Sequence, residues 1–206
     1  MRIIGRCALI ICLLGVSPLL TATTVAQLSF DEVVGTADLV FEGRVVSVEA
    51  RATGPRSIHT FVEFEILDVL KGEYTGTRIE LSYLGGRVGN RQLEVSDMQL
   101  PEAGETGVYF VESSGTPRVR QLHPLVGWSQ GHYLIVQDSN GRAHVQSAGH
   151  QPIRAVNIAP FAAAQTLNED GVASGVQIQA IADEGSAMSA AGFKALVRER
   201  VQELTP

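Results

Sequence analysis

One stretch of the chain matches the motif that surrounds the nucleophile of many serine hydrolases. Residues 127–131 read Gly-Trp-Ser-Gln-Gly, which fits G-x-S-x-G, and an acid and histidines follow in the order of that fold's triad: Asp138, then His144 or His150. The motif requires a strand before the serine and a helix after it, so that the hydroxyl stands on a strained turn. Here the residues after Ser129 alternate as a strand does, over 132–137. We therefore interpret Ser129 as part of a glycine-flanked loop and expect no catalytic residue there.

The histidines are the side chains that suggest a metal site. They are His59, His123, His132, His144 and His150. None of them are three or four residues apart, and no H-E-x-x-H occurs, so no pair can share one turn of a helix. Two of them could still meet across neighbouring strands. We expect structural or exposed histidines, with neither a metal nor another cofactor.

A pair of carboxylates is the remaining arrangement that could do acid/base chemistry. Glu63 and Glu65 lie on one face of a predicted strand, and two carboxylates at that spacing resemble a glycosidase pair. The opposite face of the same strand is apolar, with Val62, Phe64 and Ile66. We interpret the two glutamates as the solvated face of a half-buried strand.

Two loop residues are candidates for contact with a partner. Residues 85–90 read Gly-Gly-Arg-Val-Gly-Asn, but no lysine followed by a hydroxyl residue accompanies these glycines, so a phosphate cradle is not expected. We predict a hairpin loop with Arg87 near its tip, where a partner could reach it. Trp128, the single tryptophan, lies in another loop and would be a natural hot spot if exposed, although a place in the core is the alternative.

The first 26 residues predict export. Arg2 and Arg6 form a short positive region, an apolar stretch follows over 7–20, and residues 24–26 have the small side chains that a signal peptidase needs. Gly15, Ser17 and Pro18 interrupt the apolar stretch, which argues against a membrane anchor that is not cleaved. We therefore predict a signal peptide over 1–26, no membrane span in the mature chain, and a secreted or periplasmic location.

Cleavage there would change both the cysteine content and the charge. The two cysteines, Cys7 and Cys12, lie in the signal segment, so the mature chain would contain no disulfide and no thiolate. The net charge of the whole chain is −6, and removal of two of its 16 basic residues while all 22 acidic ones remain makes it −8. Because such a charge repels phosphate backbones, nucleic acid is not an expected partner.

Hydrophobic alternation with a period of two runs through most of the mature chain, from about 38 to 148, and predicts strands with one buried face. The pattern is clearest over 62–66, in a strand that ends at Lys71 and Gly72. Asn140-Gly141 predicts a hairpin with a type I′ turn. The first strand is expected to begin near Val40. Further strands are expected over 77–84, 91–95, 106–112, 118–122, 132–137 and 143–147. Strands without helices between them favour an antiparallel sandwich or barrel.

Helices are expected only at the two ends of the mature chain. Ser29 and Glu32 have the spacing of a capping box and predict a short helix over 30–37. We place the barrel domain at 27–150, a linker at 151–187 that contains a brief strand near 176–181, and a C-terminal helix at 188–206. Ser189 can cap this last helix, which has one apolar stripe of Phe193, Leu196, Val197, Val201 and Leu204. The stripe would dock on the barrel or, as the alternative, capture a partner.

Three segments, 37–45, 60–72 and 104–111, resemble the netrin-like module, which is the OB-type barrel of the tissue inhibitors of metalloproteinases. They also resemble uncharacterised secreted bacterial proteins in which Lys-Gly closes the second strand and Gln-Gly, here Gln130-Gly131, precedes a late one. The resemblance covers 38–147 and implies a mainly β, antiparallel OB-like barrel. In the inhibitors an N-terminal cysteine chelates the protease zinc, whereas the mature chain here would begin at Gln27, so that inhibition is not implied.

These observations together predict a non-enzymatic binding module, secreted or periplasmic, that contacts another protein. Arg87 and Trp128 are the candidate contact residues. One alternative is a hydrolase of unfamiliar type that uses Ser129, His132 or the face of Glu63 and Glu65. The other is an envelope-associated structural protein that is anchored by its C-terminal helix.

Overall fold

The computed structural model describes residues 25–96, 98–112, 123–157, 165–166, 171–178 and 187–204. Nearly all of the expected signal peptide and the strand expected at 118–122 lie outside these residues. The elements follow one another as β1 (Ala26–Gln27), α1 (Phe30–Thr36), β2 (Leu39–Ala52), β3 (Ile58–Lys71), β4 (Arg78–Leu84), β5 (Gly86–Val88), β6 (Arg91–Leu93), β7 (Thr106–Val111), η1 (Trp128–Gly131), β8 (His132–Gln137), β9 (Ala143–Ser147), β10 (Ile153–Val156), β11 (Gln165–Thr166), β12 (Val176–Ile178) and α3 (Ala190–Leu204).

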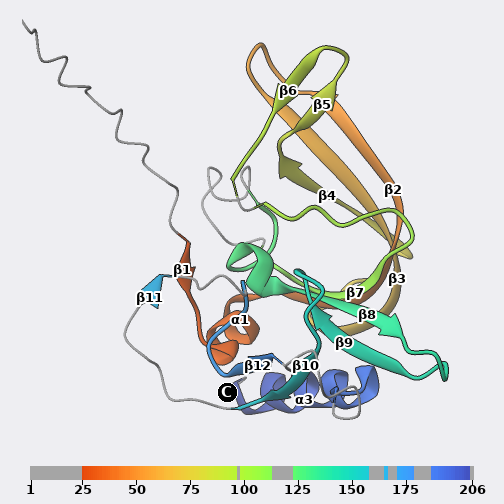
Figure 1. The fold of residues 1–206 in the computed structure, drawn as a ribbon, viewed down its shortest axis with the longest axis vertical. Coiled ribbons are helices and arrows are strands. Elements are labelled where there is room, and N and C mark those ends of the chain that lie inside the picture. The colour runs from red at the N-terminus through yellow and green to blue at the C-terminus, as the bar shows by residue number, and fades with distance from the viewer. Residues whose placement is uncertain are drawn as a thin grey trace, which may run out of the picture.

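A six-stranded antiparallel sheet forms the centre of the molecule, with the strand order β4-β3-β2-β7-β8-β9. The predicted mainly β, antiparallel class is confirmed, and β4, β6, β7, β8 and β9 lie where the alternation predicts them. β2 and β3 are longer than expected and together make the tall hairpin of Figure 1.

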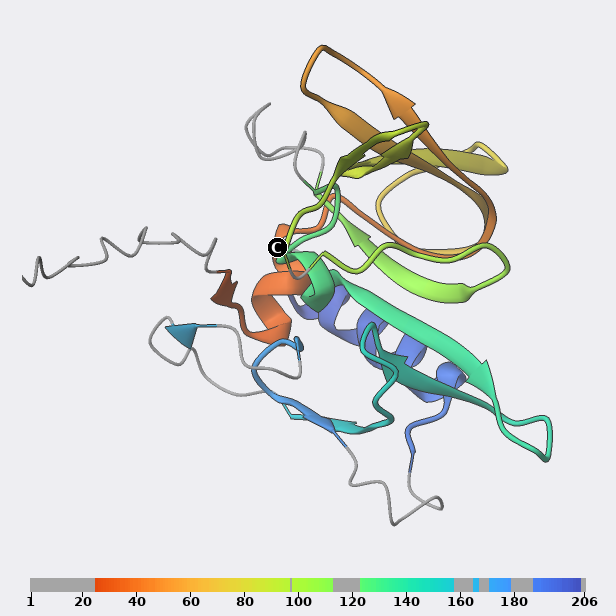
Figure 2. The same cartoon turned by 45° about the horizontal axis from the view of Figure 1, so that its top comes forward.

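The predicted closure into a barrel is not found. β4 and β9 are the two edges of the sheet, and no pairing between them occurs in the described residues. Figure 2 shows that β2, β3, β4 and β7 curl around a common interior. The apolar side chains of Met98, Leu100 and Leu125 pack against that interior from neighbouring loops. These side chains cover the interior of the curled sheet, although no backbone hydrogen bonds between edge strands close it into a barrel.

Irregular pairing explains why the long strands bend. The register of β2 against β3 shifts between Val40 and Phe41, between Glu42 and Gly43, and between Val45 and Ser47. Each such irregularity increases the local twist of a strand. Because successive side chains of a strand point to opposite faces, β2 contributes to two separate cores: Val40 belongs to one and Phe41 to the other.

The two cores lie on opposite faces of the sheet. The helix core contains side chains from α1, α3, β7 and β8, among them Phe30, Phe110, Tyr133, Phe193 and Val197. The sheet core fills the interior of the curl and contains Phe41, Phe64, Tyr83, Tyr109 and Leu125. Both cores are rich in aromatic rings that meet edge to face or at a tilt.

α1 forms where the capping box predicts it. The Ser29 hydroxyl accepts a hydrogen bond from the amide of Glu32, and the Glu32 carboxylate accepts one from the amide of Ser29. At the other end of α1, Lys71 donates to the carbonyl oxygens of Val34 (2.7 Å) and Gly35 (2.9 Å). A cation at this position satisfies carbonyls that have no partner within the helix. The lysine that ends β3 therefore also caps α1.

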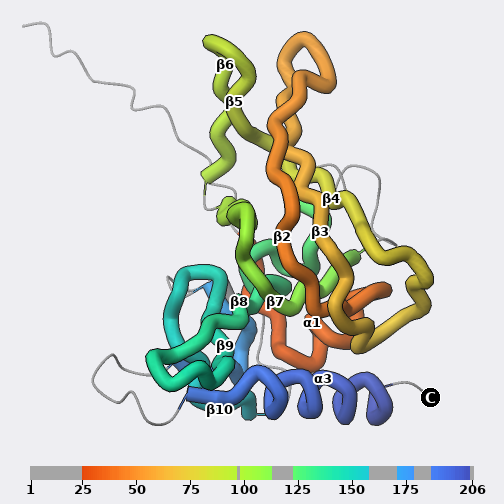
Figure 3. The backbone as a smooth tube through the Cα atoms, turned by 90° about the vertical axis from the view of Figure 1, so that its right-hand side faces the viewer, coloured from red at the N-terminus to blue at the C-terminus, as the bar shows by residue number. Residues whose placement is uncertain are grey.

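α3 docks on the sheet, beneath β2, β3 and β9 (Figure 3). The Ser189 hydroxyl accepts from the amide of Gly192, as the predicted cap requires. Phe193 and Val197 are fully buried in the helix core. Arg200 binds both carboxylate oxygens of Asp31, at 2.9 and 2.7 Å, and so joins α3 to α1. The centre of the apolar stripe is therefore occupied within the molecule.

Parts of the expected linker are strands instead. β12 confirms the brief strand expected near 176–181, and it pairs with β10, which sequence analysis did not predict. Ile153 and Val156 of β10 are buried in the helix core. Four residues are too few to show a period of two, so this strand depends on its partner and on burial. No helix of the described residues is long and apolar enough to span a membrane.

Asn140-Gly141 lies in the β8–β9 hairpin as predicted, but the turn is of another type. Gly141 has a φ of +75°, whereas Asn140 does not have a positive φ. The amide of Gly141 donates to Asp138, and the amide of Asp138 donates to Arg142. This is the pattern of a three-residue loop with glycine in the left-handed position, not of type I′.

Candidate functional site

Ser129 lies in the short 3-10 turn η1, and β8 follows it directly. The turn therefore has the local structure that we predicted, a loop that leads into a strand. The Ser129 hydroxyl donates to the carbonyl oxygen of Gly171 at 2.8 Å. Because its proton is held by a backbone carbonyl, the hydroxyl has the geometry of a structural group.

The neighbouring Gln130 has a structural role that sequence analysis missed. Its side chain is fully buried, accepts from the amide of Leu28 at 2.8 Å, and donates to the carbonyls of Ala26 (2.9 Å) and Gly127 (3.1 Å). It therefore holds the N-terminal segment against η1. The Gln-Gly pair of the resemblance is part of this anchor.

Glu63 and Glu65 are held in ion pairs on the outer face of β3. Arg78 reaches Glu63 at 3.3 Å, and Arg44 reaches Glu65 at 2.5 Å. Val62 and Phe64 point into the sheet core on the other face. The interpretation of the glutamates as the solvated face of a half-buried strand is confirmed.

The histidines do not gather into one cluster. His59 lies beside Thr53 at the top of the β2–β3 hairpin, and His144 lies beside Gln146 on β9. No group of three or more metal-ligating side chains occurs among the described residues. His123 and His132 are instead buried inside the molecule.

A cluster of polar aromatic side chains lies in and beside the sheet core. His132 stacks on Tyr109 with ring centres 4.8 Å apart, and His123 meets Tyr83 edge to face at 5.1 Å. Burial lowers the pKa of both histidines to about 3 and raises the pKa of both tyrosines. All four groups are therefore neutral near pH 7.

Several polar atoms of this cluster have no hydrogen-bond partner among the described residues. They are the hydroxyls of Tyr83 and Tyr109 and both ring nitrogens of His132. Buried polar atoms are nearly always satisfied in proteins, so such a concentration requires an explanation.

A cavity that we call the histidine cavity lies beside His132, but neither ring nitrogen of His132 is accessible from it, and Tyr83 and Tyr109 are not in its lining. Its volume is about 350 Å³. Its lining comes from the loop before β7, the start of β8 and the turn after β9, and it includes Gln99, Glu102, Glu105, His132 and His150. The lining thus includes two glutamates and a buried histidine.

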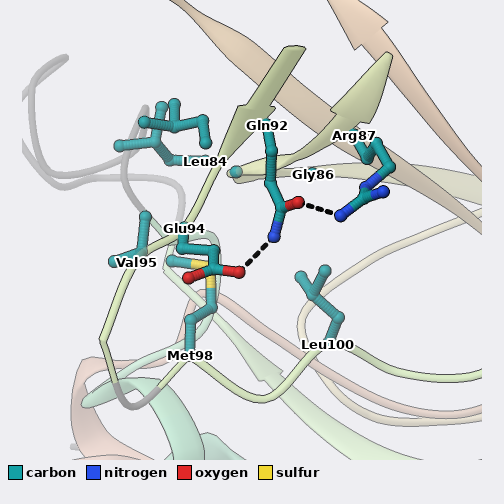
Figure 4. A pocket seen from close by; sticks show the side chains of 10 residues that line it. Leu84, Gly86, Arg87, Gln92, Glu94, Val95, Met98 and Leu100 are labelled. Carbon is teal, nitrogen blue, oxygen red and sulfur yellow. Dashed lines mark hydrogen bonds between the residues drawn. The ribbon is translucent and has the colours of Figure 1, made fainter. Parts of the chain in front are cut away.

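A second cavity, which we call the hairpin pocket, lies at the base of the β5–β6 hairpin (Figure 4). It has a volume of about 270 Å³. Leu84, Leu93, Val95, Met98 and Leu100 supply apolar lining, and Arg87, Gln92 and Glu94 supply polar groups. A chain of hydrogen bonds runs from Arg87 to the Gln92 carbonyl oxygen and from the Gln92 amide to Glu94.

The glycine-rich segment 85–90 is more ordered than the expected loop, since it contains strand β5 and the turn to β6. Gly86 has a φ of +127°, and a Cβ there would lie 2.5 Å from the Thr60 hydroxyl. The same hydroxyl donates to the carbonyl of Gly85 at 2.8 Å. Glycine is required because β5 approaches the main sheet so closely.

The two candidate contact residues lie on different elements. Arg87 is exposed on β5 and lines the hairpin pocket. Trp128 is half-buried at the start of η1, where its ring stacks on His123 at 5.3 Å with an interplanar angle of 9°. Trp128 has a positive φ of 63°, which is unusual for a bulky residue. Trp128 is not among the lining residues of the hairpin pocket.

Comparison of the chain with protein-family models, curated proteins and solved structures finds no match. The functional argument therefore rests on the geometry described above.

Proposed function

We propose that the protein is a non-enzymatic binding module, secreted or periplasmic, that contacts another protein through the hairpin pocket. The observation that carries this proposal is the pocket itself, an apolar hollow with a polar rim beside a projecting hairpin. Energetically dominant interface contacts are large side chains in such desolvated pockets.

The size of the pocket supports a side chain as the occupant. Sites for whole small molecules occupy about 300 to 1,000 Å³, and the hairpin pocket, at about 270 Å³, lies just below that range. One large apolar side chain of a partner would bury itself against Leu93, Val95 and Met98. The adjoining main chain of the partner would then lie near Arg87 and Gln92.

The rim is already organised for binding. Gln92 is held between Arg87 and Glu94 by hydrogen bonds, and the close contact at Gly86 ties the hairpin to the sheet. Groups that are ordered before binding lose less conformational entropy when a partner arrives.

The test uses residues 27–206 as bait against the exported proteins of the source organism. We expect one enriched protein, whose affinity falls at least about tenfold with Val95→Asp, which places a charge in the pocket, and with Arg87→Ala. Arg142→Ala is the matched control, because Arg142 is also exposed but lies on the β8–β9 turn. Equal affinity of all three variants would contradict the proposal.

The proposed export has its own test. N-terminal sequencing of the protein recovered from the periplasm or the medium should begin at Gln27. A chain that retains the first 26 residues and stays in the cytoplasm would contradict it.

The OB-like, netrin-like relationship is part of the same proposal. It is supported by the antiparallel order of the strands, by two bent 14-residue strands and by helices on one face of the sheet. An experimental structure in which the described sheet stays open at β4 once the whole chain is resolved would contradict the barrel.

A further inference from the structure

We propose that the partner binds through an acidic segment, whose carboxylates lie against arginines at the ends of two neighbouring hairpins. This inference rests on the proposed protein contact, because it names the chemistry of the partner at the hairpin pocket. The arginines are Arg56, between β2 and β3, Arg87 on β5 and Arg91 on β6. We call these three residues the arginine cluster.

The ends of the two hairpins lie side by side at the top of the molecule (Figure 1). The Arg91 guanidinium donates to the carbonyl oxygens of Gly54 at 3.3 Å and Pro55 at 2.8 Å. It therefore lies against the residue that precedes Arg56. Arg87 lines the hairpin pocket itself. The arginine cluster thus extends from the pocket to the ends of both hairpins.

The arginine cluster lacks the carboxylate partners that neutralise most other arginines of the described residues. Ion pairs with carboxylates are formed by Arg44, Arg51, Arg78, Arg142, Arg198 and Arg200. Within the part of the chain that the structure describes, no member of the cluster forms an ion pair, and outside it the same holds for Arg154 on β10.

The sequence around the cluster is basic in a chain that is acidic overall. Residues 51–59 and 85–93 contain Arg51 and the whole arginine cluster but no aspartate or glutamate, although the chain has 22 acidic residues. All three members of the cluster are exposed. A local positive field on an otherwise negative protein attracts anions to that one place.

The guanidinium groups keep donors for a carboxylate. Arg87 donates to Gln92, and Arg91 donates to main-chain carbonyls, in each case through Nη2. A guanidinium has five N–H donors in a planar fork that matches the two oxygens of a carboxylate. The remaining donors on Nε and Nη1 are therefore suited to glutamate or aspartate side chains.

The rim of the hairpin pocket gives the acidic segment a direction. Arg87 and Glu94 lie at the two ends of the hydrogen-bond chain through Gln92 (Figure 4). One side of the rim is thus positive and the other negative. We infer a segment whose large apolar side chain fills the pocket, and whose carboxylates lie on the side of Arg87 and lead away from Glu94.

An anionic membrane fits this surface less well than an acidic peptide. The ends of the hairpins, residues 53–57 and 89–90, have no large apolar side chain. Segments that bind a membrane surface bury such side chains in it. Here the apolar element is instead a hollow, which accepts a side chain. A phosphate polymer would supply charge, but it has no group to bury against the apolar lining.

The experiment measures the binding of blocked peptides to the immobilised mature chain by surface plasmon resonance. In two peptides a leucine is followed or preceded by three glutamates, so that the glutamates reach the arginine cluster in either direction of the bound chain. We expect saturable binding of one of them, and binding should weaken as sodium chloride is raised. Replacement of its glutamates by glutamines should weaken binding about tenfold.

Matched variants locate the charge. Arg56→Glu reverses an exposed charge that has no ion pair to lose, and it should lower the association rate constant about tenfold with little change in dissociation. Arg154→Glu is the control, because Arg154 is also exposed and without an ion pair but lies on β10, and it should leave both rates unchanged. Glycine in place of the peptide's leucine should instead speed dissociation, because it removes the contact with the pocket.

Three results would overturn the inference: equal binding of the glutamine peptides, equal effects of Arg56→Glu and Arg154→Glu, or tighter binding to phosphatidylglycerol vesicles or polyphosphate than to the peptide. The two proposals fail separately. If the leucine contributes and the glutamates do not, the pocket contact stands and the acidic segment is wrong. If only the glutamates contribute, the arginine cluster stands and the contact through the hairpin pocket is wrong.

Discussion

At the residue scale, the buried polar groups determine how the stability of the fold depends on pH. His123 and His132 are almost fully buried, so protonation of either ring would leave a charge without solvent. Burial disfavours the charged form, and the effect on pKa is therefore also an effect on folding stability.

The two histidines should make the protein sensitive to acid. Their pKa is about 3 in the folded chain against about 6.5 in the unfolded chain. Between these values the unfolded state binds more protons, so the free energy of unfolding falls as the pH falls. The loss is at most about 1.4 kcal/mol per pH unit for each histidine.

Urea denaturation at a series of pH values between neutral and about pH 4 checks this dependence. Carboxylates also titrate in that range, so the decisive comparison is between the native chain and His132→Phe. The variant should show a shallower fall in stability, and identical slopes would contradict the assignment to His132.

Gln130 supports a second residue-scale prediction. Gln130→Ala removes the side chain that binds Leu28, Ala26 and Gly127, and it leaves a buried gap. We expect a loss of about 2 to 4 kcal/mol in the free energy of unfolding. In a chain that begins at Gln27, the bonds to Leu28 and Gly127 remain, so the expected loss is at the lower end.

Hydrogen exchange at the amide of Leu28 is the specific measurement. This amide donates directly to Gln130 and should exchange much faster in Gln130→Ala. Gln137→Ala, at an exposed position on β8, is the control. Unchanged protection of Leu28 in Gln130→Ala would show that the anchor does not hold the segment.

At the element scale, α3 is an integral part of the fold. Its buried ring, Phe193, contacts Phe30 at 5.9 Å and Tyr133 at 4.9 Å between ring centres. It thereby joins α3, α1 and β8 in the helix core. The ion pair between Arg200 and Asp31 adds a second link between the helices.

Phe193→Ala should therefore destabilise the protein by about 3 to 5 kcal/mol, as for other large-to-small changes in a core. Leu204→Ala, at the exposed end of the same helix, should cost no more than about 0.5 kcal/mol. Chemical denaturation of both variants gives the comparison. Equal, small effects would mean that the stripe of α3 does not pack as described.

At the scale of the whole molecule, the C-terminal part of the chain completes one of the two cores. β12 pairs with β10, and five buried residues join Phe30 and Tyr133 in the helix core: Val172, Ala173, Ala190, Phe193 and Val197. The tail is therefore not a separate appendage of a complete β domain.

Truncation after Pro160 tests whether the fold requires the C-terminal part of the chain. The shortened chain lacks β12 and α3, and it would expose the apolar faces of α1, β8 and β10. We expect no cooperative thermal transition and strong binding of a hydrophobic dye. A truncated chain that unfolds cooperatively, like the full chain, would show that the sheet is self-contained.

The sequence by itself determined the features that depend on local interactions. The capping box joins Ser29 and Glu32, three residues apart, and the alternation over 62–66 needs only the geometry of one strand. Such patterns depend on neighbours in the chain, so they also place the ends of α1 and the hairpin at Asn140-Gly141. The apolar stripe of α3 likewise predicts a buried face, although not the surface that buries it.

Only the tertiary structure decided the features that depend on distant segments. The open edge at β4, the burial of Gln130 and His132, and the pairing of β10 with β12 all arise from contacts between residues far apart in the chain. Nothing in the local sequence distinguishes a buried histidine from an exposed one, because burial is set by the packing of the whole chain. The hairpin pocket likewise brings together residues from β4, β5, β6 and the loop after β6, so only the tertiary structure reveals it.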